Sequence, residues 1–155
     1  MLKKVLKTLL IVIIILPIFA GIFIVVANNY LADKIEKELA HYQMPENTEF
    51  VDSLSIAGKL TGSGNGMQYM GAILVKSELG EEDLKAYYSR EFEFIEVRKQ
   101  ISPELEFGIS GNYSFDSKLK LEDENYYSII CWDSDRKEIF GDSVSRLLDL
   151  DIRGH

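Results

Sequence analysis

Few residues of this 155-residue chain have the types and spacing that catalysis or metal binding needs. The single cysteine, Cys131, lies in an apolar stretch, where a free thiol behaves as a small buried hydrophobe. The only histidines are His41 and His155, so a Cys/His nucleophile has little support. Three such residues at positions 41, 131 and 155 also lack the ligand spacing of a zinc site.

The carboxylates offer two weak candidates. The run 81–83 (Glu-Glu-Asp) could serve acid/base chemistry, but at the start of a predicted helix the helix dipole alone explains it. The run 133–138 begins like a calcium loop and then places Lys137 and Glu138 where a ligand and a glycine are required. We therefore interpret it as a charged turn, and an enzyme using Asp116, Asp133 or Asp135 stays an alternative.

A glycine-rich segment, Gly58 to Gly66, invites a phosphate-loop interpretation. A nucleotide P-loop would need a glycine at Ser53 and a hydroxyl at Leu60, and a dinucleotide fingerprint would need a third glycine at Met67. The segment is better explained as a hairpin loop in which Asn65-Gly66 supplies positive φ angles. It could also touch a partner, as exposed loops often do.

The remaining motifs are weaker still. No Gly-x-Ser-x-Gly elbow occurs, and the glycosylation pattern 112–114 opens a predicted strand. Tyr126, Tyr127 and Trp132 could form a surface for a glycan or peptide, but aromatic residues in strands usually belong to the core. We predict no catalytic, cofactor-binding or metal-binding residue, no cofactor and no enzymatic activity.

The charge is distributed unevenly along the chain. Its 17 Lys and Arg stand against 25 Asp and Glu, and three of the cations (Lys3, Lys4 and Lys7) precede a long apolar run, whereas every acid follows it. The part beyond residue 27 thus carries 14 cationic side chains against 25 acidic ones, a net −11. So acidic a surface repels phosphate backbones, which argues against nucleic-acid binding.

Residues 9–27 are 19 consecutive residues without a charged or strongly polar side chain. As a helix this run is roughly 28 Å long, close to the hydrocarbon thickness of a bilayer. Pro17 and Gly21 are tolerated in such a helix, because lipid offers the backbone no competing partners. We predict a transmembrane helix that makes the bilayer a partner of the protein.

The cations of residues 1–8 place that segment in the cytoplasm and the rest of the chain outside the cell membrane. Asn28, Asn29 and Tyr30 would suit the outer headgroup layer. The alternative is a signal peptide cut before Asn28, although signal cores usually run about 7–15 residues. A lipoprotein is excluded, since a cysteine would have to replace Asn28.

The external part is expected to begin with a stalk helix over residues 28–44, continuing the transmembrane helix and ending before Pro45. Leu31, Ile35, Leu39 and Tyr42 form one narrow apolar stripe on it, which could instead be a dimer seam. Oligomeric state is left open.

Residues 45–155 are expected to form one domain. Alternation and apolar runs predict strands over 50–56, 67–75, 94–98, 113–121 and 126–132, with 113–121 the clearest, and a helix after Gly80 whose buried face is Leu84, Tyr87, Tyr88 and Phe92. Residues 143–152 fit either a strand or a helix. The fold class is therefore α+β: a transmembrane helix, then one antiparallel sheet (β-β-α-β-β-β) with a helix on one face.

The stretches 57–59, 66–69 and 71–77, the Tyr87-Tyr88 helix and the run 151–155 together resemble uncharacterised single-pass membrane proteins of Gram-positive bacteria. The resemblance implies a bacterial cell-membrane setting and no particular activity. With the transmembrane helix, it leads us to expect an extracytoplasmic interaction domain that binds an envelope protein or wall component through its sheet or the 58–66 loop. An envelope enzyme, or a subunit oligomerising through the helix and stalk, are the alternatives.

Overall fold

The computed structural model describes residues 1–60, 66–105, 111–116, 118–121, 125–132, 144 and 146–151. Its elements are α1 (Leu2–His41), β1 (Thr48–Gly58), β2 (Gln68–Ser77), α2 (Glu81–Tyr88), β3 (Ile95–Gln100) and β4 (Tyr126–Trp132). The strands form one antiparallel sheet in the order β1-β2-β4-β3. The expected α+β class, with a long apolar N-terminal helix and a helix packed against an antiparallel sheet, is confirmed.

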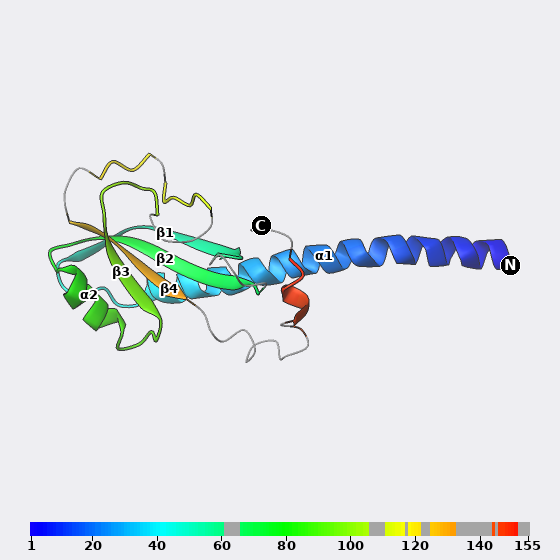
Figure 1. The fold of residues 1–155 in the computed structure, drawn as a ribbon, viewed down its shortest axis with the longest axis horizontal. Helices are drawn as coiled ribbons and strands as arrows, with labels where there is room; N and C mark the ends of the chain where they lie inside the picture. The colour runs from blue at the N-terminus through cyan, green and yellow to red at the C-terminus, as the bar shows by residue number, and fades with distance from the viewer. Residues whose placement is uncertain are drawn as a thin grey trace.

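The helix α1 has two halves with different surroundings. Its apolar first half projects alone from the folded domain, whereas its second half runs along the sheet (Figure 1). Large apolar side chains from Val5 to Phe23 are exposed, and burial starts at Ile24. By length and composition the first half can cross a membrane, a property shared by signal sequences.

The segment expected as a free stalk is instead part of the core. Leu31, Ile35 and Leu39 are buried against the sheet, and Tyr42 packs beside them. The sequence identified the apolar stripe correctly but not the surface that it packs on. A stripe of this width can pack on a sheet as well as on a second helix, and the sequence does not distinguish the two. Asn28 also differs from expectation: it is fully buried in protein rather than exposed at an interface.

Gly71 on β2 lets the helix approach the sheet closely. A Cβ atom built at Gly71 would lie 2.4 Å from the backbone nitrogen of Glu36 and 2.8 Å from the carbonyl carbon of Ile35. No side chain fits in that space, so glycine is required where α1 crosses β2.

The central strand β2 supplies side chains to two cores. On one face Tyr69, Ile73 and Val75 pack with α1 and with Leu84 and Tyr88 of α2. On the other face Met70, Ala72 and Leu74 pack with residues that include Leu60, Leu105 and Phe115. The described part of 111–121, drawn in yellow, covers this second face on the side away from α2 (Figure 1).

The prediction of a strand over 113–121 was wrong. Within the described part of that segment, pairing is limited to one bridge between Glu104 and Ser114. Asp116 interrupts the extended run, because its carbonyl accepts from the Leu119 amide at 2.9 Å and its carboxylate from the Lys118 amide at 3.0 Å. The apolar alternation reflects Phe115, Leu119 and Leu121 packing on the sheet without joining it.

The other expected elements are found with small shifts. The predicted strands 50–56, 67–75, 94–98 and 126–132 correspond to β1, β2, β3 and β4, and the first two form the expected hairpin. α2 follows Gly80 and ends before Phe92, which is half-buried. Of the undecided segment, Val144 and residues 146–148 are helical.

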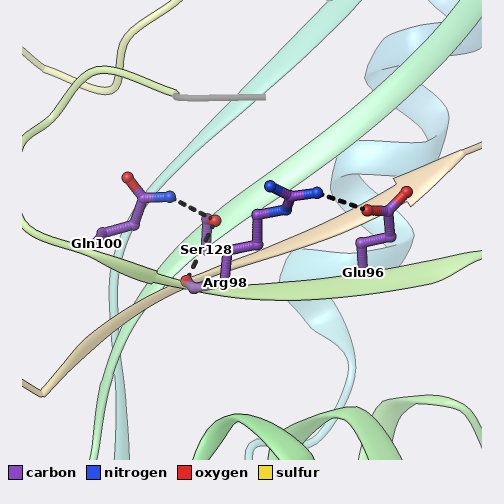
Figure 2. A network of polar contacts seen from close by, with 4 residues as sticks. All are labelled: Glu96, Arg98, Gln100 and Ser128. Carbon is purple, nitrogen blue, oxygen red and sulfur yellow. Dashed lines mark hydrogen bonds and ion pairs between the residues drawn. The ribbon is translucent and has the colours of Figure 1, made fainter. Parts of the chain in front are cut away.

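Strand β3 at the sheet edge carries polar groups on the second face. Figure 2 shows the Gln100 side-chain amide donating to the Ser128 hydroxyl at 2.7 Å, which in turn lies 3.4 Å from the Arg98 carbonyl. Glu96 and Arg98 form an exposed ion pair at 3.5 Å along the same strand. Gln100 and Ser128 are both buried, and these hydrogen bonds give their side chains partners at this edge of the sheet.

Candidate binding groove

A groove opens beside the end of α1. It has a volume of about 560 Å³ and lies between the last turns of α1, the connection 91–94 before β3, and the end of β4. We call it the α1–β4 groove; it is lined by Ile35, Glu38, His41, Tyr42, Glu91, Phe92, Glu93, Phe94, Cys131 and Trp132. Polar and aromatic side chains therefore converge on one concave surface, which is the usual form of a binding site.

The charges at the groove are mainly negative. Glu38, Glu91 and Glu93 are exposed along it, and Glu38 is also 3.6 Å from Lys34 on the solvent side of α1. The groove also lies at the carbonyl end of α1, where the helix dipole carries partial negative charge. Both effects favour a positively charged ligand.

Aromatic rings form one wall of the groove and fix its shape. The ring of Tyr42 lies 5.4 Å from that of Phe92, edge to face, and 5.8 Å from the rings of Tyr87 and Tyr88. Edge-to-face pairs of this kind add stability beyond the area they bury. These ring contacts stabilise the wall, and Phe94 at its rim is 45% exposed and can contact a ligand.

Two phenols tie this wall to the chain that follows α1. The Tyr87 hydroxyl donates to the carbonyl of Gln43 at 2.9 Å, and the Tyr88 hydroxyl lies 3.2 Å from the sulfur of Met44. Burial raises the pKa of Tyr88, and the neighbouring Tyr87 and Tyr42 raise it further. Tyr88 is thus a neutral packing residue at physiological pH.

The fold brings His41 and Cys131 into the same groove, although they are far apart in sequence. The His41 Nδ1 lies 2.7 Å from the Lys37 carbonyl, so this nitrogen carries a proton and donates it. The Cys131 thiol is buried and donates to the Trp132 carbonyl at 3.8 Å. Neither contact is the thiol–imidazole hydrogen bond that would activate a nucleophile.

The other candidates from the sequence lie elsewhere. Asp116 is exposed and holds a turn, with its amide donating to the Asp52 carboxylate at 2.7 Å. Asp133 and Asp135, and with them the broken calcium pattern, lie outside the described residues. So do 61–65 of the glycine-rich loop, whose Leu60 is buried in the second core. Glu81, Glu82 and Asp83 are exposed in the first turn of α2.

The aromatic residues of β4 do not form one surface. Tyr127 packs with the α1 side of the sheet, whereas Tyr126 packs with the opposite face. Trp132 alone reaches the groove. In the described ranges, no three His, Cys, Asp or Glu side chains are placed to share a metal ion.

Sequence reasoning missed the groove because its walls come from three distant segments. The one local signal was the alternation Glu91-Phe92-Glu93-Phe94. This pattern is equally typical of the start of a strand, so it does not indicate a groove. The chain matches no protein-family model, no curated protein and no solved structure.

Proposed function

We propose that this protein is a single-pass, membrane-anchored domain that binds a positively charged segment of another envelope protein in the α1–β4 groove. It acts by binding and not by catalysis. The observation that carries this proposal is the groove itself, with three carboxylates and a wall of packed aromatic rings on one concave surface.

The continuity of α1 supports an anchor in preference to a cleaved signal. A cut before Asn28 would fall inside the helix, between Ala27, which is 6% exposed, and Asn28, which is fully buried. The residues on both sides of that cut belong to the folded domain. The exposed apolar stretch before them matches the thickness of a bilayer.

The flanking charges support an orientation with residues 1–8 in the cytoplasm. Lys3, Lys4 and Lys7 are exposed at the N-terminal end of the apolar half of α1, and the acidic domain follows its C-terminal end. Cations on the cytoplasmic side of a span set its direction. The resemblance to single-pass proteins of Gram-positive bacteria suggests the bacterial cell membrane as the setting.

The groove chemistry favours a Lys- or Arg-bearing segment as ligand. Carboxylates attract the cationic head groups, and Tyr42, Phe94 and Trp132 offer rings for their stems and for cation–π contact. The strongly acidic composition beyond residue 27 would also speed the encounter with a basic partner.

The burial of the apolar stripe on residues 28–44 argues against a dimer formed through this part of α1. Leu31 and Leu39 are 1% and 0% exposed because they pack on the chain's own sheet. A seam between two stalks would require this packing to be undone.

Binding of a fluorescent lysine-rich peptide to the full-length protein in nanodiscs tests the proposal. We expect the double charge reversal Glu91→Lys with Glu93→Lys to weaken binding at least about tenfold, as charge pairs at interfaces do. Glu46→Lys with Glu104→Lys is the matched control, because both are exposed acids outside the groove. Equal binding by the two double variants would contradict the proposal.

A further inference from the structure

The segment 146–151 lies against α1 at the end of the domain nearest the apolar half. It is drawn in orange-red to red in Figure 1, closer to the N-terminal end of α1 than any strand. Leu148 is buried in the same core cluster as Ala27 of α1. The segment therefore sits one turn of helix from Ile24, where the exposed apolar stretch stops.

Hydrogen bonds hold this segment to the helix. The side-chain amide of the fully buried Asn28 donates to the Leu148 carbonyl at 3.2 Å and to the Asp151 carboxylate at 2.8 Å. The Tyr69 hydroxyl donates to the amide oxygen of Asn28 at 2.6 Å. Helix, sheet and segment thus share one buried polar network, which fixes the segment's height along α1.

The two acids of the segment are turned toward protein. Asp151 is 3% exposed and bonded to Asn28, and the Asp149 carboxylate accepts from the Met67 amide at 2.8 Å. The exposed side chains of 146–151 are therefore one cation and two leucines. Leu150 is 64% exposed and Leu147 is 37% exposed, which is costly for leucine in water.

The exposed surface of 146–151 is cationic and apolar, whereas the chain beyond residue 27 is strongly acidic. A cation beside exposed leucines suits the boundary between lipid headgroups and acyl chains, where apolar side chains insert and an arginine meets phosphate. Val26 and Tyr30 of α1 are also exposed, but at two residues from Asn28 they lie on the other side of the helix and are not part of this surface.

We propose that the 146–151 segment is a second membrane contact, in which Leu147 and Leu150 insert into the lipid interface beside α1 and Arg146 faces the headgroups. This inference rests on the proposed anchoring of α1 in a bilayer. Two contacts with lipid, joined through Asn28, would set the orientation of the domain, and with it the direction in which the α1–β4 groove faces.

Quenching of tryptophan fluorescence by brominated phosphatidylcholine tests this contact. Full-length protein carrying Trp132→Phe, to remove the native fluorophore, receives Leu150→Trp and is placed in vesicles with and without brominated acyl chains. Ile101→Trp is the control. Ile101 is 78% exposed and directly follows β3, at the same end of the sheet as the start of β1. That end lies beside the C-terminal end of α1, away from its apolar half. Leu16→Trp reports on the apolar half of α1.

We expect brominated lipid to quench Leu150→Trp and Leu16→Trp and to leave Ile101→Trp unchanged. Quenching of Leu16→Trp alone would overturn the second contact and leave the anchor intact. Quenching of neither would overturn both. Emission from Leu150→Trp that is blue-shifted but not quenched would assign the leucines to a protein contact, such as a second copy, and would also overturn the inference.

Discussion

Asn28 is the residue through which α1, the sheet and the segment 146–151 are hydrogen-bonded to one another. It lies on α1 directly after the apolar run, and its side chain bonds to the sheet through Tyr69 and to the segment 146–151 through Asp151. Its position after the apolar run suggested a headgroup-facing residue. In the structure Asn28 is buried, and its side chain bonds to protein groups instead of lipid headgroups, because a buried polar side chain needs partners within the protein.

We predict that Asn28→Ala destabilises the domain by on the order of 3 kcal/mol, because three hydrogen bonds of a fully buried amide are lost. Urea unfolding of the detergent-solubilised protein, followed by circular dichroism, measures the change. Asn112→Ala is the control, the same substitution at an exposed asparagine, and should cost much less. Equal losses for both variants would remove Asn28 from the centre of the network.

Tyr88 provides a prediction on pH. Burial raises its pKa above the ordinary value of about 10, so the folded state keeps the proton where the unfolded state loses it. Its contribution to stability is thus complete below about pH 10 and is lost as the pH rises beyond.

Tyr88→Phe should therefore make the urea midpoint fall less steeply than in the wild type between about pH 9 and pH 11. The comparison is between the slopes of the two pH profiles, so that pH effects common to both proteins cancel. Parallel pH profiles would show that the Tyr88 hydroxyl does not titrate differently in the folded and unfolded states.

Among the elements, α1 is the one that serves two environments. Its exposed apolar half has side chains suited to lipid, and its second half supplies Leu31, Ile35 and Leu39 to the core. Because α1 is one continuous helix, the packing of its second half on the sheet sets the direction in which its apolar half leaves the domain (Figure 1). Gly71 sets how closely the helix approaches β2.

Gly71→Ala should destabilise the protein by about 1–3 kcal/mol, because the added methyl group meets the backbone of α1 and cannot be relieved by a rotamer change. Thermal unfolding in detergent measures this loss. Gly21→Ala adds the same group where nothing lies within 4 Å, and it should leave the unfolding temperature unchanged. A neutral Gly71→Ala would mean that α1 is less closely packed than described.

The elements also show how far sequence patterns reach. Strands β1 to β4 and helix α2 were predictable because their alternation, apolar runs or helical period agree with the turn and helix-start signals beside them. The run 113–121 has an equally regular period but packs on the sheet through a turn at Asp116, since alternation reports burial and not pairing. The α1–β4 groove had no comparable signal, because tertiary packing alone joins Glu38, Glu91 and Trp132.

At the scale of the whole molecule, an acidic domain is joined to an apolar helix without a free stalk. The first half of α1 projects from the domain along one direction, and the segment 146–151 lies where the two meet (Figure 1). Under the proposed anchoring, the domain rests directly on the bilayer and holds its groove at a fixed height above it.

Alkaline carbonate extraction of membranes that contain the full-length chain, followed by intact-mass measurement, tests the central claim that α1 anchors this domain uncleaved. We predict that the protein stays in the membrane pellet after ultracentrifugation and has the 17.7 kDa mass of the whole chain. Recovery in the soluble fraction, or a mass that corresponds to a chain starting at Asn28, would contradict it.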